Sequence, residues 1–290
     1  MYPRAQIFSF SGMTSGDYGN SRYDKWRLWR QRVRQGAIMA TAVITTEKLY
    51  KTFSAGGVQQ DVLRGLDLEI YEGDFTIIMG SSGAGKSTLL YALSGMDKPT
   101  SGGVCFKDKE LTSYSEDQLA IFRRKNCGFI FQQVYLLDNM SVLDNILACG
   151  LLSKKSKREL IEKAADLLKL VDLDEVLWHK YPSQLSGGES QRVAVVRAVI
   201  NNPIVVFADE PTGALNSASG KAVLDVLTEI NNSGQSIIMV THDVRSARRG
   251  NRIIYLRDGV VCGECQLDKY VSGDKCRHDK VNEFLNGMGW

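Results

Sequence analysis

The segment Gly80-Ser-Ser-Gly-Ala-Gly-Lys-Ser87 has the pattern G-x-x-x-x-G-K-S, which is typical of a loop that binds phosphate groups. Its glycines let successive backbone N–H groups turn toward one anion, and the helical pattern that follows adds the positive end of a helix. We predict that Lys86 contacts the β- and γ-phosphates of a nucleotide and that the Ser87 hydroxyl is a ligand of Mg²⁺.

Polar side chains end three other apolar, strand-like segments. Asp209 and Glu210 end "IVVFADE", His242 ends "IIMVTH" and Gln132 ends "GFIFQ". Because ligands of parallel sheets bind at the carboxyl ends of the strands, we expect these side chains beside the phosphate loop. We predict that Asp209 is a second Mg²⁺ anchor, that Glu210 is a base that polarises a water molecule toward the γ-phosphate, and that His242 contacts that phosphate.

A second glycine-rich turn, Leu185-Ser-Gly-Gly-Glu-Ser190, precedes the helical pattern "QRVAVVRAVI". We expect a helix that starts near Glu189, so that the N–H groups of Ser186, Gly187 and Gly188 form a further anion site with the helix N-terminus. This anion site has no lysine and no metal ligand of its own.

Strands and helices alternate around these motifs. The predicted strands are residues 41–53, 62–74, 75–80, 127–132, 203–210, 235–243 and 252–259. The predicted helices are residues 87–96, 116–126 and 221–231, with a largely helical block over 139–200. This alternation predicts an α/β fold in which a parallel sheet has helices on both faces and carries the helical block as an insertion.

The composition is that of an ordinary globular protein, with 43% hydrophobic and 24% charged residues among 290. No apolar run approaches the roughly 18 residues that span a bilayer, and the N-terminus does not resemble a secretory signal. Seven basic and two acidic residues lie in residues 1–38, so the remainder of the chain carries a net charge of −2. The charge therefore does not indicate nucleic-acid binding.

Residues 1–40 are a basic extension with two interpretations. Trp26, Trp29 and Val33 recur at helical spacing among arginines, which is typical of an amphipathic helix on a membrane surface. The alternative is a disordered segment, and Met39 offers a second start directly before the folded region.

The cysteines also have two interpretations. Cys262, Cys265, Cys276 and His278 are residue types that bind zinc. In the alternative, which we favour, the first two lie in a strand after a turn at residues 258–259, where continued alternation would point residues three apart to opposite faces.

Taken together, these motifs resemble the ATP-binding subunit of ABC transporters in order and spacing, over residues 42–264. The resemblance implies an ABC-type nucleotide-binding domain with a RecA-like parallel sheet core, an N-terminal antiparallel β subdomain and an inserted helical subdomain. The implied boundaries are 1–40 for the extension, 41–265 for the ATPase domain with its helical insertion near 133–200, and 266–290 for a C-terminal tail.

The resemblance also implies ATP hydrolysis with ATP and Mg²⁺ as cofactors. In that family two copies pair head to tail, and the "LSGGQ" signature of each copy closes over the γ-phosphate held by the other. Phe53 matches the aromatic residue that stacks on adenine, with Tyr50 as the alternative. Gln132 matches the Q-loop glutamine that joins the metal site to the transmembrane partner, and "GALN" at 213–216 matches the D-loop.

The site residues implied in this way fall into three groups. The nucleotide-binding residues are Phe53, Gly80, Ser81, Ser82, Gly83, Ala84, Gly85, Lys86, Ser87, Thr88, Gln132, Ser186, Gly187, Gly188 and Glu189. The catalytic residues are Glu210, His242 and Lys86, and the metal ligands are Ser87, Gln132 and Asp209. Two positions depart from the family pattern, because Glu189 stands where glutamine is commonest and Asn216 where the D-loop usually has aspartate.

Within the family, "GFIFQQVYLLDNMSVLDNILA" and "FADEPTGALN" resemble the MacB, LolD and FtsE group, whose permeases have large extracellular domains. "LLDNMSVLDNI" resembles most closely the BceA-type subunits of peptide-antibiotic resistance transporters. This implies a peripheral ATPase on the cytoplasmic face of a bacterial plasma membrane, with such a permease and a second copy of itself as partners and no nucleic acid. It would energise export or detachment of a peptide antibiotic or lipid-linked compound. The alternative is an FtsE-like ATPase that transmits force without transport.

Overall fold

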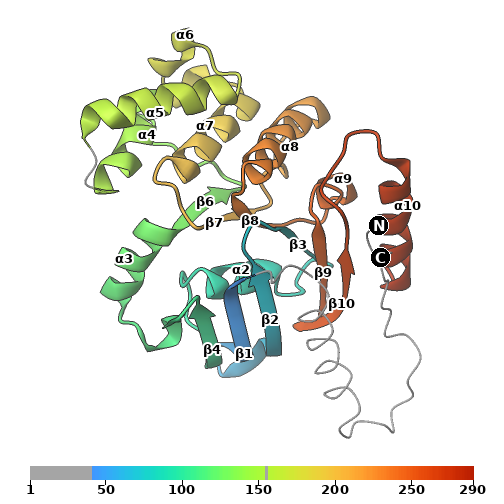
Figure 1. Ribbon diagram of the computed structural model, residues 1–290. Helices are drawn as coiled ribbons and strands as arrows, with labels where there is room; N and C mark the ends of the chain where they lie inside the picture. The colour runs from blue at the N-terminus through green and yellow to red at the C-terminus, as the bar shows by residue number, and fades with distance from the viewer. Residues whose placement is uncertain (1–40, 154–155) are drawn as a thin grey trace, which may run out of the picture.

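The computed structural model describes residues 41–153 and 156–290, so the predictions for residues 1–40 lie outside the described residues. Two β-sheets form the framework of this part of the chain (Figure 1). The smaller sheet has the strand order β2-β1-β4-β5, and the larger sheet has the order β10-β9-β3-β8-β7-β6. Among the described residues, no helix combines the length and the apolar character that a membrane span requires.

The smaller sheet is antiparallel and begins with a long hairpin. Its strands are β1 (Ala42–Ala55), β2 (Val58–Tyr71), β4 (Ser101–Phe106) and β5 (Lys109–Glu110). Gly56 and Gly57 form the turn of the hairpin with positive φ angles, as the glycine-rich sequence predicts. The sequence did not predict β4, because "SGGVCF" starts with small residues and lacks a clear alternation of apolar and polar side chains.

The larger sheet has a parallel part that positions the predicted site. Its strands are β3 (Phe75–Met79), β6 (Cys127–Phe131), β7 (Val205–Asp209), β8 (Ser236–Val240), β9 (Arg252–Arg257) and β10 (Val260–Gln266). β10 is antiparallel to β9, and the others run parallel to their neighbours. β3 and β8 are buried at every residue, which explains their uninterrupted apolar sequences.

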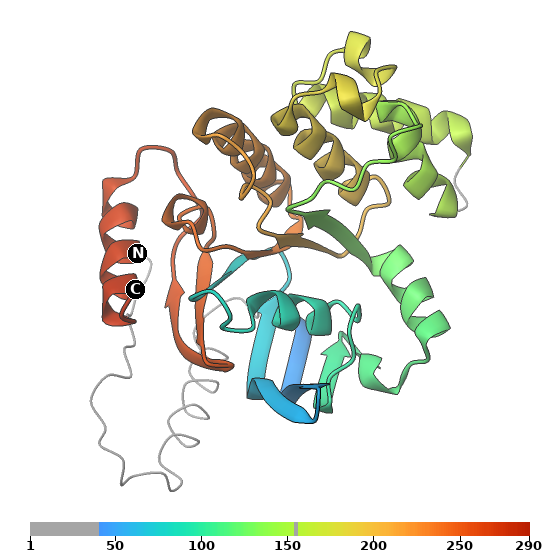
Figure 2. The ribbon, with the colours of Figure 1, turned by 180° about the vertical axis from the view of Figure 1, so that it is seen from behind.

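Helices cover the two faces of this sheet in separate layers (Figures 1 and 2). On one face, α2 (Lys86–Leu93) and α3 (Glu116–Asn126) pack with Ile78, Phe207 and Ile238. On the other face, Ile77, Val206 and Ile237 belong to the core cluster that includes the remaining long helices. These are α4 (Val142–Gly150), α5 (Lys157–Leu170), α7 (Gly187–Val199), α8 (Ser217–Asn232) and α10 (Lys275–Gly287).

Short elements complete the described chain. They are η1 (Leu111–Ser113), η2 (Leu151–Ser153), α6 (Glu175–Trp178), η3 (Pro182–Gln184) and α9 (Val244–Ala247). Four of the longer helices have a serine as their N-cap. The side chain of each of these serines accepts a hydrogen bond from a backbone N–H of the first turn, and they are Ser115, Ser141, Ser156 and Ser186. The helical block therefore has start signals that are readable in the sequence.

Residues 266–290, which the sequence assigns to a C-terminal tail, include α10. Val281, Phe284 and Leu285 are buried in the core cluster. Arg277 is 4% exposed and donates hydrogen bonds to the carbonyl oxygens of Arg248 at 2.5 Å and Asp268 at 2.7 Å. This segment is therefore tied to the region that follows β8.

The expectation that Cys262 and Cys265 face opposite ways is wrong. The pairing of β10 with β9 shifts register between Val261 and Gly263. A bulge of this kind changes the phase of the alternation, so both cysteines pack against the same core cluster. Within residues 41–153 and 156–290, no cluster of three or more His, Cys, Asp or Glu side chains is arranged to hold a metal ion.

Candidate functional site

The phosphate loop lies between β3 and α2, pressed against neighbouring backbone. A Cβ atom on Gly80 would lie 2.1 Å from the carbonyl oxygen of Leu256 in β9. At Gly85, where φ is +93°, it would lie 2.8 Å from the carbonyl oxygen of Val62 in β2. Only glycine fits at these two positions, so both sheets fix the path of the loop.

Lys86 starts α2 and is 7% exposed. Its Nζ donates a hydrogen bond of 2.8 Å to the carbonyl oxygen of Ser81. Burial lowers the pKa of Lys86, and the nearby carboxylates of Glu210 and Asp209 oppose that shift. An ammonium group has three N–H donors, and the described residues engage one of them, so this lysine can also bind phosphate oxygens.

Ser87 and Asp209 meet as the sequence predicts. The Ser87 hydroxyl donates a hydrogen bond of 2.8 Å to Asp209 Oδ1. Two adjacent ligands of octahedral Mg²⁺ at about 2.1 Å from the ion lie about 3 Å apart, so a hydroxyl and a carboxylate oxygen at this spacing fit such an ion. The other oxygen, Oδ2, accepts a hydrogen bond of 2.7 Å from the Tyr91 hydroxyl, a contact that the sequence analysis missed.

Glu210 and His242 lie together at the ends of β7 and β8. His242 Nδ1 is 3.1 Å from Glu210 Oε1. The Glu210 N–H donates to the carbonyl oxygen of Val240, and its φ angle of 46° lies in the left-handed region. A non-glycine residue held there by neighbouring structure is typical of functional sites, so the backbone conformation supports the role predicted for this carboxylate.

The segment after His242 is held by a short cap. The carboxylate of Asp243 accepts hydrogen bonds from the N–H groups of Arg245 and Ser246 and from the Ser246 hydroxyl. Burial alone would raise the pKa of Asp243, but these hydrogen bonds bring it below its usual value. An ionised cap fixes the residue next to His242, whose own side chain is exposed.

Gln132 follows Phe131, whose position in β6 is opposite Asp209 in β7. A Cβ atom added to Gly213 would lie 2.8 Å from the side-chain Nε2 of Gln132, so this side chain lies against the D-loop segment. The carbonyl oxygen of Phe131 accepts a hydrogen bond of 3.0 Å from Gln191, which is buried in α7. The structure therefore brings Gln132 to the predicted edge, and its role as a metal ligand stays a prediction.

The second glycine turn forms a helix N-terminus, but the helix starts earlier than expected. α7 begins at Gly187, and Ser186 is its N-cap. Glu189 Oε2 accepts hydrogen bonds of 2.7 Å from both the N–H and the hydroxyl of Ser186. The hydrogen bond from the Ser186 side chain, followed by that from its backbone, lowers the pKa of Glu189, so this carboxylate is ionised at neutral pH.

The two anion sites lie in different layers of the fold. α7 packs on the face of the sheet opposite to α2, as Figures 1 and 2 both show. In the part of the chain that the structure describes, no hydrogen bond joins Ser186, Gly187 or Gly188 to the phosphate loop.

The aromatic candidates for adenine stacking differ in their surroundings. Tyr50 packs against its own sheet, because its hydroxyl would be 2.8 Å from a Cβ atom on Gly65. Phe53 is 46% exposed, and the Lys51 ammonium lies 5.0 Å from its ring centroid. Tyr50 is nevertheless 42% exposed, so the two rings are similarly accessible, and the assignment of Phe53 to adenine stacking stays a prediction.

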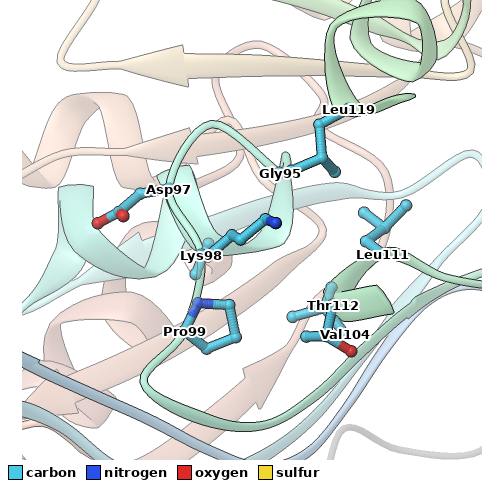
Figure 3. Close-up of a pocket in the computed structure, with 9 residues that line it drawn as sticks. Gly95, Asp97, Lys98, Pro99, Val104, Leu111, Thr112 and Leu119 are labelled. Atoms are coloured by element: carbon cyan, nitrogen blue, oxygen red, sulfur yellow. The ribbon is translucent and has the colours of Figure 1, made fainter. Parts of the chain in front are cut away.

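Two hollows lie near these elements. The smaller, of about 10 Å³, lies beneath the loop after α2 and is lined by residues that include Lys98, Pro99 and Leu111 (Figure 3). That volume suits one water molecule, not a nucleotide. The larger, of about 1010 Å³, is a groove that extends from Glu210 and His242 between α8 and α9 to the segment before α10.

The chain is similar in sequence to known ATP-binding proteins of ABC transporters. A family model described as ABC transporter matches residues 63–213. The chain is 45% identical to the ABC transporter ATP-binding protein MJ1508 of Methanocaldococcus jannaschii, over 76% of this chain and 97% of that protein. It is 40% identical to the lipoprotein-releasing system ATP-binding protein LolD of Idiomarina loihiensis, over 77% of this chain and 98% of that protein.

Two further matches bear on architecture. The chain is 36% identical to the macrolide export ATP-binding/permease protein MacB of a Shewanella species, of which it spans 39%. Among solved structures, it is similar to the dimeric ATP-binding cassette MJ0796 bound to ADP and Pi, with a TM-score of 0.72 and 38% identity over 78% of this chain and 100% of that chain. This likeness confirms the predicted fold class.

The geometry predicts different outcomes for Glu210→Gln and Lys86→Ala. Glu210→Gln should retain ATP and ADP binding but hydrolyse ATP about 10²- to 10⁴-fold more slowly, because it loses only the base. Lys86→Ala should weaken nucleotide binding itself, because a buried phosphate-binding ammonium is removed. Titration calorimetry with ADP and a phosphate-release assay measure the two effects. Turnover of Glu210→Gln near that of the parent protein would remove Glu210 from its predicted role.

Proposed function

The chain belongs to the ABC transporter family as an ATPase subunit of the LolD/MacB type, and from this premise we propose that it binds ATP and Mg²⁺ at the phosphate loop to energise a separate permease. The observation that carries the proposal is the meeting of Ser87 with Asp209 at 2.8 Å and of Glu210 with His242 at 3.1 Å beside the loop. A hydroxyl–carboxylate pair suits Mg²⁺, and a carboxylate next to an imidazole suits water activation and γ-phosphate contact.

In this proposal the residues of the site have different tasks. The loop N–H groups and Lys86 bind the phosphates, and Phe53 stacks on the adenine. Ser87 and Asp209 hold Mg²⁺, which neutralises charge on the phosphates when bound. Glu210 accepts a proton from the attacking water, and His242 both orients this carboxylate and contacts the γ-phosphate.

We further propose that two copies form the working site. The N-cap at Ser186 belongs to α7, which packs on the face of the sheet opposite to α2, and among the described residues no hydrogen bond joins it to the phosphate loop of its own chain. We therefore assign the Ser186 helix N-terminus to a γ-phosphate that Lys86 of a second copy holds. MJ0796, which is similar over 78% of this chain, forms a dimer, and this supports the arrangement.

The segment after Gln132 is our candidate for the permease contact. Tyr135 is 64% exposed and Leu137 is 51% exposed, while Leu136 between them packs against the core. The guanidinium of Arg197 donates to the carbonyl oxygens of Val134 and Tyr135 at 2.7 and 2.6 Å. A rigid backbone that exposes apolar side chains suits a partner surface.

We propose a permease with a large extracellular domain, and a peripheral location on the cytoplasmic face of a bacterial plasma membrane. The LolD and MacB relatives support the group, and "LLDNMSVLDNI" supports a BceA-type role in export or detachment of a peptide antibiotic. Release of a lipid-linked compound is the second candidate, because the name of LolD specifies lipoprotein release. Force transmission without transport, as in FtsE, is the third.

Paired heterodimers test the composite site. One heterodimer combines a Ser186→Arg chain with a Lys86→Ala chain, and the other combines a chain carrying both substitutions with a parent chain. The first should hydrolyse ATP, because it keeps one site with Lys86 from one copy and Ser186 from the other, and the second should be inactive. A site contained within one chain predicts the reverse order of activity in the same assay.

Tyr135→Glu should uncouple ATP hydrolysis from the permease, because an ionised side chain is placed in an apolar contact. In liposomes containing the permease, stimulation of the ATPase should fall at least about tenfold for a contact of this kind. Val58→Glu is the control, since Val58 is 71% exposed in the β1–β2 turn region. Nucleotide binding should be unchanged in both variants, and unaltered stimulation of Tyr135→Glu would exclude this surface.

The transported compound is tested with the same liposomes. A peptide antibiotic should raise the rate of ATP hydrolysis severalfold at micromolar concentration, as substrate binding shifts the complex toward its closed form. A lipoprotein fragment in its place tests the second candidate. Stimulation by neither compound, with a permease that still activates the ATPase, would favour the force-transmitting alternative.

A further inference from the structure

Tyr91 makes a contact in the candidate metal site that the functions proposed above do not use. Ser87 and Tyr91 are four residues apart in α2 and therefore lie on one face of the helix. The Ser87 hydroxyl donates to Asp209 Oδ1 at 2.8 Å, and the Tyr91 hydroxyl donates to Asp209 Oδ2 at 2.7 Å. One helix thus engages both oxygens of the carboxylate at the end of β7.

We propose that Tyr91 is a positioning residue that holds the Asp209 carboxylate in the orientation that serves Mg²⁺. The inference rests on the proposed function, in which Asp209 and Ser87 hold that ion. Tyr91 binds Oδ2, which leaves Oδ1 directed toward Ser87 and available to the ion. Hydrogen bonds to a metal-binding carboxylate fix its direction and tune its affinity for the ion.

The groups that donate hydrogen bonds to the Asp209 carboxylate are the hydroxyl groups of Ser87 and Tyr91. No lysine or arginine of residues 41–153 and 156–290 forms an ion pair with Asp209 within 4.0 Å. Ser87 is itself a predicted ligand, so its oxygen has to serve the ion as well. Tyr91 is therefore the donor that orients Asp209 without also binding the metal.

The phenol of Tyr91 is a hydrogen-bond donor at neutral pH, and it donates to Asp209 Oδ2 at 2.7 Å. The ring packs, half-buried, against the core cluster that contains Leu89 and Leu90. A planar side chain with two torsion angles, fixed by packing, holds its hydroxyl in one place.

Tyr91→Phe removes this hydroxyl and keeps the ring, so the fold is retained. The Mg²⁺ concentration for half-maximal ATP hydrolysis should rise about tenfold, and the rate at saturating Mg²⁺ should stay close to that of the parent protein. The affinity of the ADP-loaded protein for Mn²⁺, measured by electron paramagnetic resonance without turnover, should fall by a similar factor. ADP binding in the presence of EDTA should be unchanged.

Tyr71→Phe is the matched control. The Tyr71 hydroxyl donates a hydrogen bond of 2.7 Å to Glu69 in β2, away from the phosphate loop. This variant loses the same kind of contact and should keep the metal affinity of the parent protein.

The inference is wrong if Tyr91→Phe leaves both metal affinities unchanged, or if Tyr71→Phe shifts them equally. Weaker ADP binding in EDTA by Tyr91→Phe would also overturn it, because that result would indicate a distorted loop. Failure of the parent protein both to hydrolyse ATP with Mg²⁺ and to bind Mn²⁺ with ADP would instead contradict the proposed function on which the inference rests.

Discussion

The hydrogen bond from Ser87 to Asp209 joins α2, the helix that follows β3, to the end of β7, although β3 and β7 are not neighbours in the larger sheet. β8 lies between β3 and β7, so the phosphate loop that follows β3 has to bring Ser87, the second residue of α2, past the end of β8 to the end of β7. This requires β3, β8 and β7 to be parallel and in register, because a slip of one residue would turn Asp209 to the other face. It also requires a tight loop, which the backbone approach of Leu256 to Gly80 enforces. The geometry of the candidate site thus follows from the pairing order of the sheet.

Much of this arrangement could be predicted from the sequence. The parallel strands are short apolar runs, and the polar residues that end them lie at one edge whatever the side-chain details, so Asp209, Glu210 and His242 were found by position alone. The sequence predicts that α7 starts near Glu189 because Gly187 and Gly188 are typical turn residues, whereas the capping box of Ser186 and Glu189 includes both glycines in the helix. A capping pattern of this kind is readable in sequence and gives the better boundary.

Other features could not be predicted because they depend on contacts between distant residues. Tyr91 and Asp209 are 118 residues apart, and the spacing of Ser87 and Tyr91 shows only that the two share a helix face, not what that face meets. The positive φ angle of Glu210 depends on the bond of its N–H to Val240 in the next strand. The bulge in β10 likewise depends on pairing with β9 and reverses the expected direction of one cysteine. Local sequence patterns determine which segments form helices and strands, whereas contacts between distant segments determine which side chains meet in the site.

One helix connects the two surfaces that the proposed function needs. α7 has Ser186 as its N-cap, its Gln191 donates to the carbonyl oxygen of Phe131, and its Arg197 donates to the carbonyl oxygen of Tyr135. Asn145 of α4, buried at 2% exposure, adds hydrogen bonds to the N–H and carbonyl of Leu137. A displacement of α7 therefore moves the segment after β6 with it, because the buried hydrogen bonds of that segment would otherwise be lost at a cost of about 1–3 kcal/mol each. If the N-terminus of α7 moves to meet a phosphate held by a second copy, the exposed side chain of Tyr135 moves with the helix. In the proposed function, closure of the nucleotide site would thus be transmitted to the permease through a single rigid element.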